Sequence, residues 1–360
     1  MIHITGRAFK LPTITAGLAL GFVAFSTAPA AAQEKSASRA QAPSYHVLAA
    51  HTLGGDGGWD YLALDTAGHR LFIARQNRVM VVDPDRGTVL GEIPGFHGAH
   101  GVAFSYTTGR GFVTSGADST VTIFDLATLR VLGHTMVDVD DDAILYDPAS
   151  THIFTMNGDA GTSSVIDAAT GKRLGTIPLG GKPEFGVSDG DGKVYVNLED
   201  KGAIVELDAK AMKVIRTWSI APCESPTGLA IDIAHQRLFS VCRNKLMAIS
   251  DASAGKLVTT VPIGSGVDAA RFDAATGDAF ASNGEGSLTV VHESSPNKFE
   301  TVQTVPTMTG ARTMELDLGN HRVYVVGAKF GAAPAQPTAS NPRRRPPMVP
   351  GSFTLVVLGS

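Results

Sequence analysis

The sequence predicts an all-β protein, a seven-bladed β-propeller whose blades are four-stranded antiparallel sheets. One observation is that an apolar run ending at a turn residue recurs seven times at intervals of roughly 42 residues, a spacing typical of propeller blades. Another is that each of the first six repeats contains four such runs separated by turn sequences. A third is that the last repeat contains only three runs, while one unassigned run precedes the first repeat.

The first strand of each repeat is expected at Trp59–Asp65, His100–Ser105, Asp142–Asp147, Glu184–Asp189, Thr227–Asp232, Asp268–Asp273 and Arg312–Asp317. In the third repeat, further strands are expected at His152–Asn157, Ser163–Asp167 and Arg173–Gly181. The intervening segments are rich in Asp, Gly and Pro, which suit tight turns. The runs are continuously apolar, as expected for sheets covered on both faces by neighbouring blades.

The two ends of the chain predict how the propeller closes. The seventh repeat stops at Ser352–Ser360, its third strand, and Tyr45–Gly55 near the N-terminus matches the fourth-strand pattern. We therefore expect the N-terminal strand to complete the last blade, which would remove two exposed sheet edges. Residues 45–360 would then form a single domain.

Residues 1–32 are predicted to be a secretory signal peptide, because Arg7 and Lys10 precede an apolar stretch that ends in small residues. A retained membrane anchor is the alternative, which Pro12 and Gly17 disfavour because they interrupt the stretch. Residues 33–44 are expected to be a flexible lead-in. Export would place the protein in the periplasm or outside the cell, without a stable membrane anchor.

The charge of the chain narrows the classes of partner. Removing Arg7 and Lys10 with the signal peptide leaves 28 basic against 34 acidic side chains, a net charge of −6. Nucleic acids and anionic membranes bind concentrated positive charge, so no nucleic-acid partner is expected. Arg343, Arg344 and Arg345 form one basic run, interpreted as a solvated loop or, alternatively, as a binding site.

The two cysteines lie in the fifth repeat. Cys223 is in the loop that enters the first strand, and Cys242 ends the second strand. Both positions open on the same rim, and an exported protein favours a disulfide. Two buried thiols or a metal-binding pair are the alternatives.

Function is expected on the rim where the seven repeats differ. Turns between first and second strands are nearly interchangeable, whereas the loops that cross between blades differ in every repeat. Five positions before the turn residue of each first strand, side chains are expected to ring the mouth of the central channel: Asp60, His100, Asp142, Glu184, Thr227, Asp268 and Arg312. Four carboxylates, an imidazole and a guanidinium suit a small polar ligand or a cation. The alternative is that these groups are simply solvated.

Repeats two to four offer the richest set of candidate metal ligands. These are His97, His100, Asp138, Asp140, Asp142 and Glu184. Carboxylates suit a hard divalent cation, and with imidazoles they suit a transition metal. Their spacing matches no calcium-loop pattern, and a solvated acidic loop is the alternative. Apart from such a cation no cofactor is indicated.

A proline-rich insertion at 327–351 interrupts the last repeat on the same rim. Its prolines favour extended conformations. It is interpreted as a partly ordered lid in which Arg343–Arg345 meet the acidic mouth, or as a mobile surface loop. His69, His235 and His321 lie in the uniform turns of the opposite rim and are interpreted as solvent-facing.

Two second strands contain degenerate copies of a known tetrapeptide. Tyr195–Asn197 reads YVN and Phe112–Ser115 reads FVTS. On these features the repeat resembles the YVTN family of β-propeller repeats, and the mature chain looks most like bacterial exported YncE-like proteins. The resemblance implies a seven-bladed fold. It implies little about function, because such propellers serve as binding surfaces, surface-layer components and enzymes alike, and it supplies no catalytic motif.

Three functions are compatible with these features. The first is a non-catalytic ligand-binding or protein-interaction module that uses the variable rim. The second is a metal-assisted lactone hydrolase or lyase at the channel mouth, with carboxylates holding the cation and His100 or His97 as general base. The third is an accessory to periplasmic redox or cofactor metabolism, although the chain lacks the haem-attachment motif CxxCH.

Overall fold

The structure is a computed structural model that describes residues 10–13, 44–337 and 346–360. The chain divides into two units, Met1–Gln41 and Ala42–Ser360, and every strand found in the described residues lies in the second. The predicted signal peptide and lead-in fall almost wholly outside the described residues. Within those residues, no helix is long and apolar enough to span a bilayer.

The second unit is all-β, and its repeating element is the predicted four-stranded antiparallel sheet. One sheet contains β9 (Asp141–Asp147), β10 (His152–Asn157), β11 (Thr162–Asp167) and β12 (Arg173–Pro178). The next contains β13 (Pro183–Ser188), β14 (Lys193–Leu198), β15 (Ala203–Asp208) and β16 (Lys213–Ser219). It is followed by β17 (Pro226–Asp232), β18 (Arg237–Cys242), β19 (Leu246–Asp251) and β20 (Lys256–Pro262). Another contains β21 (Val267–Asp273), β22 (Asp278–Asn283), β23 (Ser287–Ser295) and β24 (Lys298–Pro306).

The remaining strands form two further sheets. One joins the ends of the chain in the order β1 (His46–Thr52), β27 (Thr354–Gly359), β26 (Arg322–Gly327) and β25 (Met314–Asp317). The other has seven strands: β2 (Leu62–Asp65), β3 (Arg70–Ala74), β4 (Gln76–Asp83), β5 (Thr88–Ser105), β6 (Arg110–Ser115), β7 (Thr120–Asp125) and β8 (Val131–Met136).

The seven-stranded sheet differs from the separate four-stranded sheets that were expected. Its cause is β5, which pairs with β4 in its first half and with β6 in its second. Gly95 and Gly98 both have positive φ, which lets the chain bend between the two halves while pairing continues. Ala99 consequently pairs with Gln76 of β4 and Ser115 of β6.

Aspartates that end the third strands explain why tight turns recur at the same place in successive repeats. Their Oδ1 atoms accept backbone N–H groups two or three residues later, which fixes the turn before the fourth strand. These aspartates are Asp83, Asp125, Asp167, Asp208 and Asp251. The pairing of third and fourth strands is also irregular in register throughout, from β4–β5 to β23–β24. Such bulges bend an outer strand and discourage edge-to-edge association.

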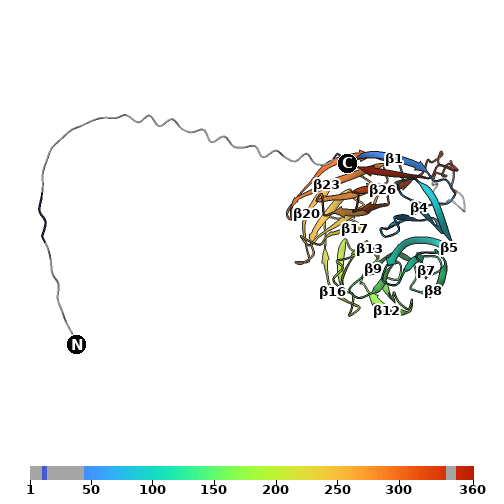
Figure 1. Cartoon of the computed structure of the whole chain (residues 1–360), viewed down its shortest axis with the longest axis horizontal. Helices are drawn as coiled ribbons and strands as arrows, with labels where there is room; N and C mark the ends of the chain where they lie inside the picture. The colour runs from blue at the N-terminus through green and yellow to red at the C-terminus, as the bar shows by residue number, and fades with distance from the viewer. Residues whose placement is uncertain (1–9, 14–43, 338–345) are drawn as a thin grey trace. The chain divides into compact units, whose positions relative to one another are not determined.

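Successive sheets pack face to face around a central region. In Figure 1, β9, β13 and β17 lie nearer the middle and β8, β12 and β16 lie at the periphery. The first strands contact one another in the order β2, β5, β9, β13, β17, β21 and β25, and β25 contacts β2. Buried apolar clusters lie between neighbouring sheets, and one of them joins Leu71 and Met80 to Tyr324 and Leu355 of the last sheet.

The strand β1 pairs antiparallel with β27, with His51 opposite Leu355. Tyr45, just before β1, is almost fully buried, and its ring packs edge-on against Phe280 at 5.0 Å. Its backbone N–H and C=O both bond to the side chain of Gln303 on β24, at 2.9 Å and 2.7 Å. The start of β1 is therefore fixed to the preceding sheet as well as to its own.

The predicted disulfide is confirmed. Cys223 and Cys242 are joined by an S–S bond of 2.00 Å with their Cα atoms 5.5 Å apart, and no cysteine is free. Both residues are buried, in an apolar cluster with Ile220 and Leu238. The bridge ties the entry of β17 to the end of β18.

The described ends of the insertion pair with each other. Phe330 forms an isolated bridge with Met348, and the N–H of Gly331 donates to the carbonyl of Pro347 at 2.8 Å. Phe330 also packs on Trp59, with ring centroids 6.1 Å apart. Residues 338–345, which include the three arginines, lie outside the described residues, so the predicted lid stays a prediction.

Candidate functional site: the mouth of the channel

The first strands converge on a pocket of about 430 Å³. Among its lining residues are five of the seven side chains predicted to ring the channel mouth: Asp60, Asp142, Glu184, Asp268 and Arg312. Three of them lie within β9, β13 and β21, and the other two precede β2 and β25. The equal spacing of these residues from the end of each first strand therefore brings them to one place.

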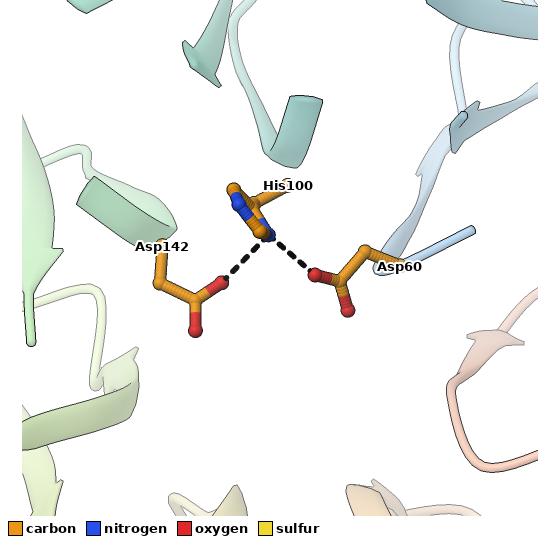
Figure 2. Close-up of side chains that lie close together, drawn as sticks. All are labelled: Asp60, His100 and Asp142. Carbon is orange, nitrogen blue, oxygen red and sulfur yellow. Dashed lines mark hydrogen bonds and ion pairs between the residues drawn. The ribbon is translucent and has the colours of Figure 1, made fainter. Parts of the chain in front are cut away.

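His100 links two of the carboxylates. Its Nδ1 lies 2.5 Å from Asp60 Oδ2 and 3.3 Å from Asp142 Oδ1, and Figure 2 shows the imidazole between the two acids. Arg312 forms a second link, with Nε 2.6 Å from Asp268 Oδ2 and Nη2 3.5 Å from Asp60 Oδ1. Asp60 is thus shared between a histidine and an arginine.

Three acids of the pocket have too little positive charge nearby to balance their own negative charges. Burial and the charge of Asp60 raise the pKa of Asp142 well above its usual range, although His100 opposes the shift. Burial, together with the charges of Asp268 and Glu199, raises the pKa of Glu184 to about 8. Burial also raises the pKa of Asp268 against the opposing charge of Arg312. An added cation would favour the ionised form of each of these acids.

His100 shifts for a different reason. Burial by itself would lower its pKa, but the hydrogen bond to Asp60 and the charges of Asp142, Asp60 and Asp141 outweigh burial and raise the pKa to about 9. The imidazole is therefore protonated at neutral pH and donates from Nδ1 to Asp60, while Asp142 lies within ion-pair distance.

Thr227 and His97 are not among the residues that line the pocket, and neither is His100, although it contacts two of the pocket's acids. Thr227 is fully buried, and its hydroxyl donates to the backbone carbonyls of Val241 and Val267 at 3.4 Å and 3.2 Å. The His97 side chain is 78% exposed, and its Nδ1 lies 3.0 Å from Asp118. Thr227 thus orders backbone beneath the mouth, whereas His97 faces solvent.

The four candidate metal-binding acids separate into two pairs. Asp142 and Glu184 line the pocket. Asp138 instead lies 2.5 Å from Arg173 Nη2 and accepts the Thr162 hydroxyl at 2.7 Å. Asp140 accepts the backbone N–H of Asp159 at 3.0 Å. The structure therefore does not bring the four together around one point.

A different metal-ligand set is present at the mouth. One ligand atom from each of Asp60, His100 and Asp142 lies within 4.8 Å of the other two. Two carboxylate oxygens and an imidazole nitrogen suit a divalent transition metal. A metal at Nδ1 would have to displace the proton that His100 carries there.

Two lining residues escaped the sequence analysis. Arg243 reaches the pocket from the β18–β19 turn, and its Nη2 lies 2.9 Å from Glu199 Oε1. The irregular sequence of that turn, Arg243–Lys245, is the signal that could have identified it. Tyr61 follows Asp60 and packs its ring on Phe185 at 5.2 Å. Its apolar surroundings in the sequence give no hint of a site residue.

Tyr61 also lines a second pocket, of about 380 Å³, whose other walls include the paired Arg271 and Glu315. Arg271 Nε and Nη2 lie 2.7 Å and 3.0 Å from the two carboxylate oxygens of Glu315. Tyr61 is itself buried, and it is the residue that lines both pockets.

Comparison with known proteins identifies the fold and nothing finer. No family model matches the chain, and no curated protein matches it. Among solved structures, the chain is similar to hydrazine synthase from Kuenenia stuttgartiensis, with 15% identity and a TM-score of 0.66, over 74% of this chain and 92% of that chain. At this identity the likeness carries the fold alone. Together with the repeated four-stranded sheets it indicates a β-propeller.

Proposed function

We propose that this protein is an exported ligand-binding module that holds a small cation, inorganic or organic, in the channel-mouth pocket. The observation that carries the proposal is the convergence of Asp60, Asp142, Glu184 and Asp268 on one pocket of about 430 Å³. The raised pKa values of Asp142, Glu184 and Asp268 indicate that nearby cations compensate these acids incompletely. A ligand with a positive group would supply the missing charge.

The proposal includes a closed seven-bladed ring in which β1 completes the last blade. The contact of β25 with β2 and the bond from the Thr313 hydroxyl to the Asp60 carbonyl, 2.9 Å long, support it. We further propose that the chain is a divergent member of the YVTN type, on the resemblance of its second strands. A periplasmic or secreted location is in keeping with the disulfide, because such bonds persist in oxidising compartments.

The test is a binding screen on tag-free protein lacking residues 1–32. Calcium, manganese, zinc, primary amines and quaternary amines would be scanned by thermal shift and then by calorimetry. We expect at least one cation to raise Tm, with the rise lost in Asp142→Asn and Glu184→Gln. His97→Ala is the matched control on the same rim and should retain binding. If every cation leaves Tm unchanged, the proposal is wrong.

A second candidate function is a metal-assisted lactone hydrolase or lyase. The observation that favours it is the metal-ligand set of Asp60, His100 and Asp142. If His100 instead acts as the base, it must first lose a proton, so the rate should rise with pH toward about 9. A panel of lactones and uronides with added manganese, calcium or zinc tests this function. His100→Ala should abolish any turnover found, and His97→Ala should retain it; absence of turnover across the panel excludes the class.

A further inference from the structure

A second cluster of ligand-type side chains lies at the far end of β17 from the mouth. Asp232 ends β17, His235 lies in the turn between β17 and β18, and Glu293 comes from β23 of the following sheet. One ligand atom from each lies within 4.8 Å of the others. From its place in a uniform turn, His235 is expected to face solvent, and nothing in the sequence pattern marks the two acids as ligands.

An extended hairpin brings Glu293 to this position. The strands β23 and β24 have nine residues each, whereas β19 and β20 of the preceding sheet have six and seven. The tip of the hairpin lies against the preceding sheet, where Arg237 Nε donates to the carbonyl of Pro296 at 2.6 Å and Nη2 to Asn297 Oδ1 at 3.3 Å. The additional residues therefore place a carboxylate of one sheet beside the first turn of its neighbour.

The geometry is that of a three-ligand site. His235 Nδ1 lies 2.7 Å from Asp232 Oδ2 and 2.9 Å from Glu293 Oε1. The carboxylates are almost fully buried, with side chains 3% and 2% exposed, while the His235 side chain is 47% exposed. A cation between the three atoms would thus have two buried oxygens on one side and open solvent on the other.

Glu293 supplies an independent indication of a missing partner. The residue is 8% exposed, and its Oε1 is paired with His235 Nδ1 at 2.9 Å. No hydrogen-bond donor to its Oε2 is found among the described residues. A buried carboxylate oxygen without a hydrogen-bond donor lowers the stability of the folded state. Glu293 also lies beside a second buried acid, Asp232.

We propose that Asp232, His235 and Glu293 bind a divalent transition-metal ion of the zinc class, with water in the fourth position. One imidazole nitrogen and two carboxylates suit zinc better than calcium, which takes six or more oxygen ligands. Tetrahedral zinc holds its ligand atoms about 3.3 Å apart, so His235 Nδ1 needs to move away from each of the two carboxylate oxygens by only about half an ångström. The ion fastens the β23–β24 hairpin to the turn that joins β17 and β18.

The experiment uses tag-free protein, lacking residues 1–32, that has been stripped with chelator and titrated with zinc chloride. We expect one zinc ion to bind at this site, and Tm to rise by about 5 °C at a free zinc concentration 100-fold above Kd. Glu293→Gln and His235→Gln should each lose that rise. In metal-free buffer, Glu293→Gln should melt at the wild-type temperature or above, because it removes one of two adjacent buried acids. A purely structural ion pair predicts the opposite, a lower metal-free Tm and no zinc effect.

Two controls separate this site from others. His321→Gln is matched, because His321 Nδ1 pairs with the buried acid Asp273 at 2.7 Å, and the described part of the chain places no second carboxylate in an ion pair with it; this variant should bind zinc as the wild type does. Asp142→Asn removes the ligand set at the mouth and should also leave this site intact. Anomalous scattering at the zinc edge from wild-type crystals provides a readout independent of any variant's folding. Zinc absent from the cluster, or retained by Glu293→Gln, overturns the proposal.

Discussion

Individual side chains at the mouth owe their properties to burial and to one another. Asp60 contacts both His100 and Arg312, so one carboxylate serves two cations. Glu184 forms no ion pair with any residue that the structure describes, and its anion is destabilised chiefly by burial and then by the charge of Asp268. Neighbouring acids in one pocket therefore differ in how strongly an added cation would stabilise their ionised forms.

The first prediction concerns the titration of His100. Among the interactions that raise its pKa to about 9, the hydrogen bond to Asp60 is the largest. Asp60→Asn removes that charge and should lower the pKa by about one unit or more, measured from the imidazole Cε1–H signal in NMR. Asp118→Asn, at the exposed partner of His97, should leave the His100 titration unchanged. An unaltered pKa in Asp60→Asn would contradict the proposed dependence.

The second prediction concerns stability as a function of pH. The folded state raises the pKa of Glu184 from 4.5 to about 8, so its contribution to stability is fully present below pH 4.5 and is lost as pH rises through 8. Glu184→Gln should therefore match the wild type near pH 4.5 and exceed its free energy of unfolding at pH 9 by up to about 5 kcal/mol, the full equivalent of a pKa change from 4.5 to about 8. Urea denaturation across this range measures the difference. Glu224→Gln, at an exposed position, should show no pH-dependent gain.

Comparison of the strands with their predicted positions shows how much of the fold could be predicted from the sequence. Strand positions in the third repeat agree closely with β9, β10, β11 and β12, because apolar runs and aspartate turns are local signals. The continuity of β5 was not predicted, because two glycines that bend a paired strand look in sequence like a loop. The length of the β23–β24 hairpin, whose strands have nine residues each, could not be predicted either. Nothing in the segment VHESSPNKFE indicates which turn of the neighbouring sheet the hairpin contacts.

The third prediction concerns the disulfide as a link between two elements. Cys223 and Cys242 close a segment with a sequence separation of 19 residues, for which loop closure gives about 3 kcal/mol. The double variant Cys223→Ala/Cys242→Ala should lose roughly that amount in chemical denaturation. The wild type with reductant should fall to a similar value, and reductant should not affect the variant. Equal stability of oxidised and reduced wild type would mean that the bridge is energetically neutral.

The molecule as a whole depends on contacts between residues that are far apart in the sequence. Tyr45 and Gln303 are separated by 258 residues, yet their bonds fix the start of β1 against β24. The pairing of β1 with β27 then covers an edge that would otherwise be exposed. A short N-terminal segment therefore joins the last sheet of the chain to the sheet that precedes it.

The fourth prediction concerns this segment. Tyr45→Ala removes a ring that is 1% exposed and packed on Phe280, and it should cost about 3 kcal/mol of unfolding free energy. Val47→Ala is the control in the same strand, because Val47 is 43% exposed, and its cost should stay below about 0.5 kcal/mol. Size-exclusion chromatography should detect association of the Tyr45 variant through the loosened edge. Equal Tm values for the two variants would show that β1 is not anchored at Tyr45.

The all-β class and the repeating four-stranded sheet could be predicted from the sequence, because they follow from periodicity: a residue's place along a strand sets the face and the end at which it emerges. The sequence favoured a disulfide over free thiols or a metal pair, and five of the seven polar positions that it predicted at the mouth line one pocket. Only the tertiary structure decided that Thr227 turns its hydroxyl to backbone carbonyls, that Arg243 enters the mouth, and that Glu293 meets His235 across two sheets. Such contacts depend on how neighbouring sheets pack against each other. Patterns within a short stretch of sequence do not encode the packing of sheets that are far apart in the chain.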